Sequence, residues 1–293
     1  MLPHDFSKKK CSIIYSKNNN LNAINVHKIL DSGAFGDVYE CDDNNKIDKK
    51  YAMKVIAHND LVNRKEIKFY KMATIWKNYD YYLPKIYCIM ADMNNYYILM
   101  KHLGTNHFNH KYYCQQKFNT GQLYILFENL MRAIQYFHKK ELILNDIKPR
   151  NIMIINDNHL QVKIIDCGLI TKYDDPKQLS TGTLYYIPPE IFDKNYQYKK
   201  KIINDKKDIW SLGIILYKFL VGNNPIKNLI EFDEFGNMIM YTEKLFDTII
   251  KMEEKMKELK IDKNLSNIIL QSLNRNPIIR PSIDILINLL HNP

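Results

Sequence analysis

The pattern of apolar residues changes near residue 104, and this change constrains the fold more than any other feature of the sequence. Between Asn25 and Met100, short runs rich in Val, Ile, Tyr and Phe alternate with polar turns, which predicts strands. Only one segment in this region, from Asp60 to Ile75, has helical spacing. From about Gln122 onward, apolar residues recur at helical intervals over long stretches. The expected fold class is therefore α+β, with a strand-rich part and a helical part.

The 293 residues are expected to form one domain with two lobes behind an extension. Residues 1–24, with the polar runs SKKK and SKNNN, are expected to be a flexible extension. Residues 25–103 are expected to form a small, mostly antiparallel β lobe with one main helix, and residues 104–293 a larger helical lobe. The expected strands are NVHKIL, FGDVYEC, YAMKVIA, KIYCIM and NYYILM, and the expected later helices are GQLYILFENLMRAIQYFHKK, DIWSLGIILYKFLVG, LSNIILQSLN and SIDILINLLH.

Composition and charge narrow the function classes. The net charge of +10 would attract nucleic acid, anionic membranes or polyphosphates, but no aromatic–basic interleaving is present, so direct nucleic-acid binding is not expected. Five scattered cysteines without a C-x-x-C pair favour a reducing compartment over a zinc site or a disulfide framework. The longest apolar run, residues 209–221, is too short to span a bilayer, and the N-terminus lacks a signal-peptide core. An intracellular, soluble protein is expected.

A hairpin pattern inside the helical part gathers four polar residues. The run NIMII, NDNH, LQVKIID predicts two strands joined by a turn, with Asn151 before the first strand and Asp166 after the second. The two open ends of a tight hairpin lie side by side. Asp146, Lys148, Asn151 and Asp166 are therefore expected to converge, which predicts a functional site.

Several short motifs together resemble those of the protein kinase family, in the family's order, over roughly Lys28 to Leu290. DSGAFGDV is similar to its glycine-rich loop, YAMK to its phosphate-lysine strand, and DIKPRN to its catalytic loop. DCG is similar to its metal-binding DFG, and PPE to the end of its activation segment. Within the family, NDIK, DCGL and GTLYYIPPE resemble kinases of large DNA viruses, the baculovirus type first and the poxvirus and vaccinia-related kinases next.

The resemblance implies an ATP- and Mg²⁺-dependent enzyme that phosphorylates serine and threonine hydroxyls of proteins. Asp146 would accept the hydroxyl proton and orient the nucleophile, while Lys148 would neutralise charge on the γ-phosphate. Lysine two residues after the aspartate is the serine/threonine-kinase pattern. Asn151 and Asp166 would hold magnesium, whose hard character suits oxygen ligands.

The strand-rich part would supply most of the nucleotide contacts. By the same resemblance, Lys54 would grip the α- and β-phosphates and pair with Glu66 of the one helical segment there. Gly33 and Gly36 would let the backbone of a hairpin lie close over phosphates. The further implied nucleotide-binding residues are Leu30, Val38, Ala52, Met100, Lys101, Leu103 and, from the helical part, Met153.

Four residues depart from the family's pattern. Asp31 replaces the first glycine of the loop, and an acid near a triphosphate weakens the case for tight nucleotide binding. Leu144 and Asn145 replace the histidine and arginine before the catalytic aspartate, and the lost arginine usually clamps a phosphorylated activation loop. We therefore expect activity without phosphorylation of that loop. Cys167 replaces the phenylalanine of DFG and is expected to be a buried, inert thiol.

Three further residues match structural positions of the family. Glu190 of PPE and Arg280 of NPIIRPS would form a buried ion pair that ties the activation segment to the helical lobe. Asp208 of DIWSLG would brace the backbone of the catalytic loop. Thr183 of GT would touch the catalytic aspartate.

Three other function classes compete with an active protein kinase. The alternative is a pseudokinase scaffold that binds nucleotide without efficient transfer, motivated by the four departures. A small-molecule kinase of the aminoglycoside or choline type has a similar catalytic loop, but Lys148 and the Glu190–Arg280 pair argue against this class. A nucleic-acid binder is supported only by net charge. Against the pseudokinase stands the retention of Lys54, Glu66, Asp146, Lys148, Asn151 and Asp166.

Two charged segments bear on partners. Residues 198–207, YKKKIINDKK, could recruit an acidic substrate or nucleic acid, but such a run is more often a solvated loop, which we expect here. Residues 226–265 are charged and partly helical, either a partner-docking insert or the family's variable helical region. The expected partner is a protein substrate, and the viral resemblance implies a basic, nucleic-acid-associated packaging protein in the host cytoplasm or nucleus. No membrane partner is expected, and the sequence sets no oligomeric state.

Overall fold

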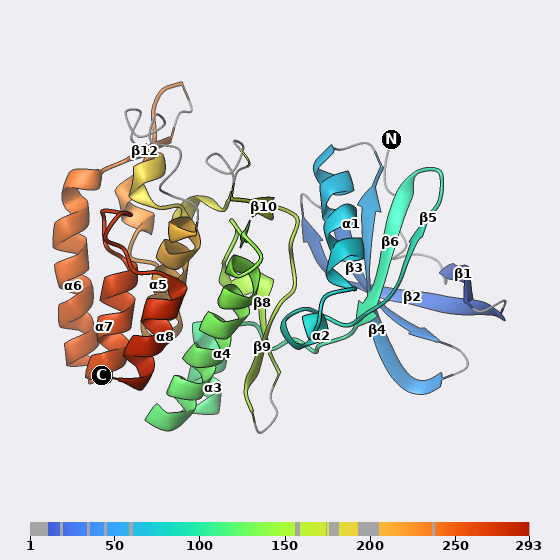
Figure 1. Cartoon of the computed structure of the whole chain (residues 1–293), viewed down its shortest axis with the longest axis horizontal. Helices are drawn as coiled ribbons and strands as arrows, with labels where there is room; N and C mark the ends of the chain where they lie inside the picture. Colours follow the sequence, from blue (N-terminus) through green and yellow to red (C-terminus); the bar gives the residue numbers. More distant parts are fainter. Residues whose placement is uncertain are drawn as a thin grey trace. The chain divides into compact units, whose positions relative to one another are not determined.

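The computed structural model describes residues 11–17, 20–33, 36–43, 46–58, 61–155, 159–173, 175, 182–192, 205–235 and 238–292. The chain forms two compact units, residues 1–104 and 105–293 (Figure 1). The boundary predicted from the sequence, between residues 103 and 104, differs from this one by one residue.

The first unit is a six-stranded antiparallel sheet in the order β1-β2-β3-β4-β6-β5. Strand β3 alternates between core and solvent, with Tyr39 and Cys41 buried between half-exposed neighbours. These two residues join Met53, Val55 and Leu99 in the core on one face. The elements are β1 (Cys11–Lys17), β2 (Asn20–Gly33), β3 (Gly36–Asp43), β4 (Lys46–Ala57), α1 (Leu61–Ala73), α2 (Tyr79–Tyr82), β5 (Ile86–Ala91) and β6 (Asn95–Lys101).

Part of residues 1–24, which the sequence predicts to be a flexible extension, forms a strand in the structure. Strand β1 pairs along its length with the start of β2, from Cys11 opposite Val26 to Lys17 opposite Asn20. The run CSIIY is rich in strand-forming residues and precedes two asparagines, so the local sequence favours a hairpin. The polar residues around it masked that pattern. Residues 1–10 lie outside the described residues.

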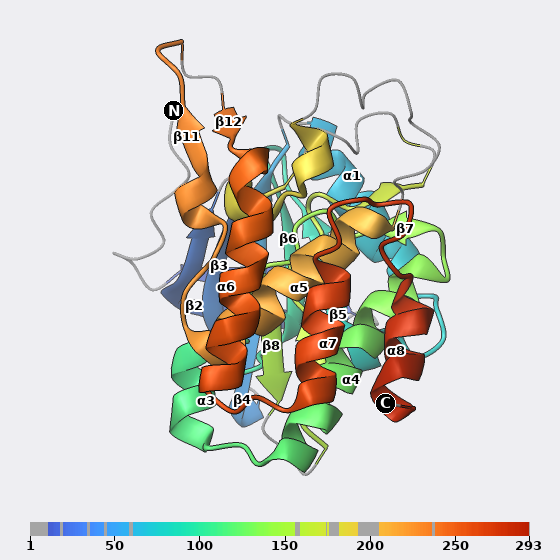
Figure 2. The ribbon, with the colours of Figure 1, turned by 90° about the vertical axis from the view of Figure 1, so that its left-hand side faces the viewer.

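The second unit is built around one buried helix. Helix α5 is buried along most of its length, and its Trp210 is fully enclosed. Helix α5 packs against α7, and α4 against α8 (Figures 1 and 2). None of the described helices is both long and apolar enough to cross a membrane. The helices are α3 (His110–Gln116), α4 (Thr120–His138), α5 (Lys206–Val221), α6 (Leu245–Glu258), α7 (Lys263–Ser272) and α8 (Ile283–His291).

The described part of the second unit also contains three small antiparallel sheets. The predicted hairpin is confirmed: β8 (Ile152–Ile155) pairs with β9 (Gln161–Ile164). Strands β7 (Leu142–Ile143) and β10 (Thr171–Lys172) form a second sheet. Strands β11 (Ile230–Phe232) and β12 (Met238–Met240) form a third. The sequence predicted none of the last four strands, because two or three residues are too few to show a period of two.

Candidate active site

A buried ion pair lies in the first unit. Lys54 of β4 places its Nζ 2.6 Å from Oε1 of Glu66 on α1, and the two side chains are 6% and 1% exposed. Helix α1 presents Glu66, Ile67 and Tyr70 to the interior and its lysines to solvent. The amphipathic pattern therefore fixes which side of the helix carries the acid. The structure brings together the two residues that the sequence paired.

The residues expected to bind the nucleotide base share one face of the sheet. In the register, Val38 lies opposite Lys54 and Ala52 lies opposite Met100. Opposite residues of antiparallel strands point to the same side, as do residues two apart. Val38, Ala52, Lys54 and Met100 therefore line the face that does not carry the Tyr39 cluster.

The strand register assigns none of the other four residues of this set to that face. Leu30 is the extra residue of an irregularity in β2, between the paired positions Ile29 and Asp31. Lys101 is opposite Tyr51, so its exposed side chain is on the other face. Leu103 follows β6 and is half-buried. Met153 belongs to the second unit, where it is buried in β8 and bridges to His107.

The glycine-rich segment is the connection between β2 and β3. Gly33 and Gly36 are paired across it, and residues 34 and 35 lie outside the described part. Gly36 has φ +117°, and a Cβ there would collide with the carbonyl oxygen of Val55. The sheet itself therefore requires this glycine. Asp31 accepts a hydrogen bond from the Ser32 backbone N–H at 2.9 Å, so part of its acidic side chain is used in the strand end.

Asp146 is the centre of a polar cluster in the second unit. Its Oδ1 accepts from the hydroxyl and the backbone N–H of Thr183 at 2.6 and 3.0 Å. Its Oδ2 accepts from Lys148 Nζ at 2.7 Å and from Asn151 Nδ2 at 3.0 Å. Lys148 also donates to Thr183 Oγ1 at 2.8 Å. The carboxylate is 8% exposed and is held in one orientation by four donors, with a cation beside it.

Asn151 and Asp166 lie at the same end of the β8–β9 hairpin. The backbone N–H of Ile165 donates to the Asn151 carbonyl at 2.9 Å, which extends the ladder by one bond. Asn151 Nδ2 donates to the carbonyl and to the carboxylate of Asp146, so Oδ1 is the Asn151 atom suited to a cation. Asp166 Oδ1 accepts from the Gly168 N–H at 3.0 Å. An amide and a carboxylate oxygen on adjoining segments fit a hard divalent ion such as Mg²⁺.

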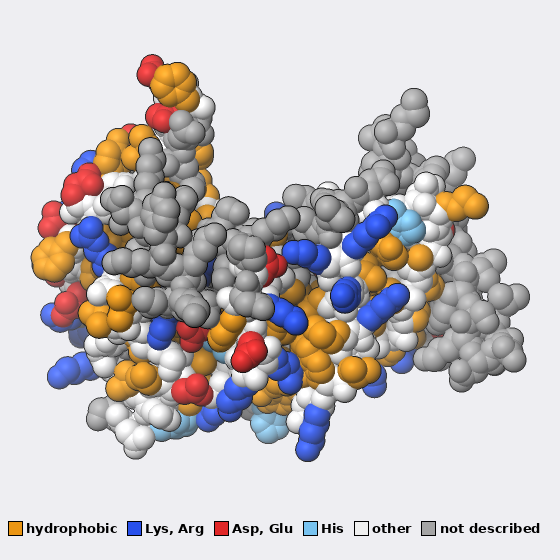
Figure 3. All heavy atoms as spheres, turned by 45° about the horizontal axis from the view of Figure 1, so that its top comes forward, with side chains coloured by type: hydrophobic (Ala, Val, Ile, Leu, Met, Phe, Trp, Pro, Cys, Tyr) orange, Lys and Arg blue, Asp and Glu red, His pale blue; other side chains and the backbone are white. Residues whose placement is uncertain are grey.

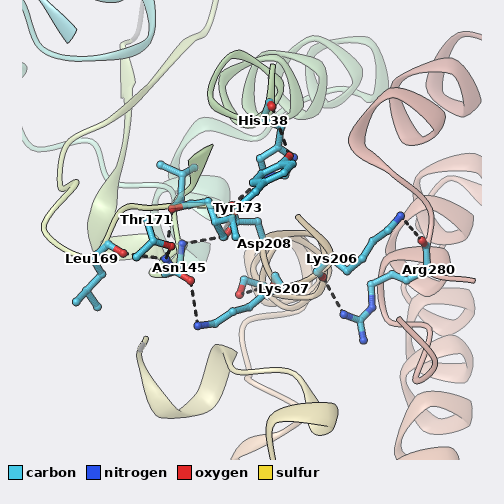
Figure 4. A network of polar contacts seen from close by, with 12 residues as sticks. His138, Asn145, Leu169, Thr171, Tyr173, Lys206, Lys207, Asp208 and Arg280 are labelled. Atoms are coloured by element: carbon cyan, nitrogen blue, oxygen red, sulfur yellow. Dashed lines mark hydrogen bonds and ion pairs between the residues drawn. The ribbon is translucent and has the colours of Figure 1, made fainter. Parts of the chain in front are cut away.

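Asp208 braces the backbone before Asp146, as the sequence predicts. Its Oδ2 accepts from the Leu144 N–H at 2.8 Å and from His138 Nε2 at 2.9 Å. Its Oδ1 accepts from the Asn145 N–H at 2.9 Å. The aspartate is fully buried in the first turn of α5 (Figure 4).

Asn145 ties the same loop to the segment that follows Asp166. Its Nδ2 donates to the Leu169 carbonyl and to Thr171 Oγ1, both at 2.8 Å (Figure 4). The residue is 3% exposed and has φ +64°, a conformation that asparagine tolerates better than most residues. The departure from arginine therefore replaces a charged side chain by a buried neutral cross-link. Cys167, directly after Asp166, is 1% exposed, so the expected burial of this thiol is confirmed.

Lys207 is the residue of this site that the sequence missed. Residues 198–207 were predicted to be a solvated loop, but Lys206 and Lys207 begin α5, and Lys207 is 3% exposed. Its Nζ donates to Asn145 Oδ1 at 3.1 Å (Figure 4). The signal was its position directly before Asp208 at the start of an apolar helix. Residues 198–204 lie outside the described residues.

Burial lowers the pKa of Lys207 from 10.5 to about 8, against the opposing charges of Asp208, Asp146 and Glu190. Below pH 8 the amine is charged in both the folded and unfolded chain. Between about pH 8 and 10.5 the unfolded chain binds more protons, so stability should rise with pH. The free energy of unfolding of the parent, minus that of Lys207→Met, should rise by about 2–3 kcal/mol as the pH is raised across this window. Urea unfolding at a series of pH values checks this.

The matched control for that titration is Lys251→Met, which removes an exposed lysine of α6. This variant removes a lysine from the surface and so measures the effect of the substitution itself. A difference in unfolding free energy between the parent and Lys207→Met that does not change with pH would show that Lys207 is charged at all these pH values.

The α+β fold, the buried Lys–Glu pair and the Asp-x-Lys-x-x-Asn loop together define a class of proteins. The chain belongs to the protein kinase family, because residues 24–291 match the family model described as "Protein kinase domain".

Relatives of known name agree with this membership. The chain is 31% identical to an Aurora kinase of Debaryomyces hansenii over 221 residues, 73% of this chain and 51% of that protein. It is 30% identical to calcium-dependent protein kinase 4 of Plasmodium berghei over 213 residues, 70% of this chain and 39% of that protein. The chain thus spans about half or less of these relatives.

A solved structure of Rad53 residues 1–466 in complex with AMP-PNP resembles the chain with a TM-score of 0.64 and 20% identity. The likeness covers 89% of this chain and 62% of that one. At this identity it shows the shared fold alone.

Proposed function

We propose that the chain is an ATP- and magnesium-dependent protein kinase that phosphorylates serine and threonine hydroxyls. The observation that carries the proposal is the geometry of Asp146, with Thr183 on one oxygen and Lys148 and Asn151 on the other. Phosphoryl transfer needs an aligned acceptor and neutralised charge more than covalent help from the protein. This cluster supplies an oriented carboxylate and an adjacent ammonium group.

Each residue of the cluster takes a separate role in the proposal. Asp146 accepts the proton of the attacking hydroxyl, and Lys148 stabilises negative charge on the transferred group. Asn151 Oδ1 and the Asp166 carboxylate hold the magnesium, which supplies further charge neutralisation when bound. Lys54, held by Glu66, binds the nucleotide phosphates. The cation of Lys148 beside the acceptor position supports serine or threonine as acceptor.

The proposal is tested by a transfer assay that separates it from the pseudokinase alternative. The parent and Asp146→Asn are incubated with labelled ATP, Mg²⁺ and a mixture of casein, histone and a basic peptide. Label on a substrate with the parent, and none with the variant, supports the kinase. Nucleotide binding by the parent without any transfer identifies a scaffold.

Activity without phosphorylation of the activation segment is part of the proposal. Asn145 carries no charge, is buried, and uses its amide on Leu169, Thr171 and Lys207. It therefore has no free positive group for a phosphate, and the cross-link to Leu169 and Thr171 holds that segment instead. Both bonds lie within one unit and need no modification.

Single alanine substitutions of Ser180 and Thr181 should therefore leave the transfer rate close to that of the parent, as measured with labelled ATP. Both residues lie outside the described part of the chain. Thr183→Ala is the contrasting variant and should lose most activity, because Thr183 contacts Asp146. A complete loss at Ser180 or Thr181 that an acidic residue restores would contradict the proposal.

A viral origin and a basic substrate are the finer parts of the proposal. The variants NDIK, DCGL and GTLYYIPPE support a kinase of the large DNA virus type. Such a kinase would act on a basic, nucleic-acid-associated protein in the host cytoplasm or nucleus. Phosphorylation of a protamine-like substrate in preference to casein supports this assignment, and the reverse preference argues against it.

A further inference from the structure

A β-hairpin in the segment 226–265 projects from the helical unit (Figures 1 and 2). Its base is fixed, because Ile230 and Met240 are paired and are only 8% and 7% exposed. The backbone N–H of Tyr241 donates to the Leu229 carbonyl at 2.8 Å and continues the pairing. The paired base of the hairpin is therefore an integral part of this unit.

The outer part of the hairpin exposes large apolar side chains. Phe232 is 61% exposed and Phe235 is 80% exposed, and Phe246 in the first turn of the following helix α6 is 69% exposed. Ile239 on β12 is 42% exposed. Two exposed aromatic side chains on one hairpin, Phe232 and Phe235, are typical of a surface that binds another molecule.

The same stretch is acidic in a basic chain. Residues 230–247 contain Glu231, Asp233, Glu234, Glu243 and Asp247 and one lysine, a net charge of −4 within a chain of +10. That lysine, Lys244, lies over the ring of Tyr241 at 4.4 Å. Figure 3 shows acidic and hydrophobic side chains together on the projection. We call the described residues 230–235 and 238–247 the hairpin surface.

We propose that the hairpin surface docks a basic segment of the protein substrate that also carries bulky apolar side chains. The inference rests on the proposed kinase function and names the substrate class. Negative charge beside exposed aromatics matches cationic groups and apolar side chains in one peptide. Nucleic acid and anionic lipid are repelled by the same charge, so they do not fit this surface.

The two components of the surface have different expected effects. The carboxylates attract a cationic segment over about one Debye length, roughly 8 Å at physiological salt, so binding should weaken as salt rises. The exposed phenylalanines bury apolar area only on contact, and aromatic anchors commonly dominate such interfaces. A peptide with both features should therefore bind more tightly than one with charge alone.

A second copy of this chain is the competing occupant. The rest of the chain has a net charge of +10 − (−4) = +14, so a basic face of another copy would also be attracted. Both oligomeric state and peptide binding must therefore be measured on the same samples.

The test uses the full chain without ATP and a fluorescein-labelled peptide of alternating lysine and leucine residues, with fluorescence anisotropy as the readout. The variants are Phe232→Ser/Phe235→Ser and Glu231→Lys/Glu234→Lys, all at exposed positions. The control variant is Ile285→Ser, which removes an apolar side chain that is 51% exposed on α8. A lysine–serine peptide isolates the contribution of charge.

We expect each hairpin variant to weaken binding of the lysine–leucine peptide about tenfold, whereas Ile285→Ser leaves it unchanged. The lysine–serine peptide should bind more weakly to the parent and lose its remaining affinity with added salt. Equal affinity of all proteins for the first peptide would overturn the proposal. So would concentration-dependent self-association, seen by sedimentation, that the hairpin variants abolish.

Failure of the docking proposal is distinguishable from failure of the kinase proposal. In a transfer assay, the hairpin variants should raise KM for a long basic substrate and leave kcat and the KM for ATP unchanged. If the chain transfers no phosphate but still binds the peptide through the hairpin, the kinase proposal is contradicted and the docking proposal is supported.

Discussion

Asp146→Asn should lower the rate of phosphoryl transfer roughly 100- to 10,000-fold, the usual contribution of a positioned general base. The parent carboxylate accepts hydrogen bonds on both oxygens, from Thr183 on one side and from Lys148 and Asn151 on the other. An asparagine amide must turn its NH₂ group toward one of these donors. The variant therefore loses both the proton acceptor and its alignment, and steady-state transfer from labelled ATP measures the loss.

A control is needed because the same change costs some stability. In the variant, the NH₂ group of the new amide faces another hydrogen-bond donor in a buried site, which costs about 1–3 kcal/mol. The free energy of unfolding should therefore fall by that amount, and the variant should stay folded at assay temperature. Glu254→Gln makes the same acid-to-amide change at an exposed position of α6 and should alter neither property. If Asp146→Asn transfers phosphate at the rate of the parent, Asp146 is not the general base of the reaction.

The elements that carry the site were predictable because their patterns are long or bounded by clear signals. Helix α4 has a wide apolar face and an Asn119–Gln122 capping box at its start. Helix α5 is apolar nearly all round and is buried accordingly. The hairpin β8–β9 has strand-forming runs on both sides of a polar turn. These three elements position Asp208, Asn151 and Asp166, so the expected convergence in the second unit followed from local patterns.

The contacts that distinguish this chain were not predictable, because they depend on where the backbone turns. Lys207 belongs to a lysine-rich run, and only the start of α5 buries it against Asn145. Asn145 was expected only to lack a charge, whereas the structure uses its amide as a cross-link. The hairpin at 230–240 has strands of three residues, which leave no periodic pattern. For Lys207 and Asn145, the missing information is a tertiary contact, not a local preference.

Arg280→Ala should lower the free energy of unfolding by about 3–5 kcal/mol, because it leaves a buried carboxylate without its partner. Arg280 binds Glu190 through both ends of its guanidinium, at 2.7 and 2.9 Å, and the two side chains are 0% and 2% exposed. Two of its other N–H groups donate to the carbonyls of Asn274 and Lys206, and it lies over the ring of Trp210 at 5.1 Å. Urea unfolding measures the loss.

Replacing both charged residues separates two causes of the lost stability. One is the buried Glu190 carboxylate that is left without a partner, and the other is the loss of the ion pair. Glu190→Leu/Arg280→Met should be more stable than Arg280→Ala, because no charge remains buried, although the carbonyls of Asn274 and Lys206 lose their donor. Arg132→Ala is the matched control: it removes a partly exposed arginine paired with Glu128 on α4 and should cost no more than about 1 kcal/mol. If Arg280→Ala and Arg132→Ala cost the same, the Glu190–Arg280 pair does not hold the segment ending in PPE to the helical unit. If Arg280→Ala lowers the free energy of unfolding strongly and Arg132→Ala does not, Arg280→Ala should also lower the rate of phosphoryl transfer. The reason is that the segment ending in PPE contains Thr183, which contacts Asp146.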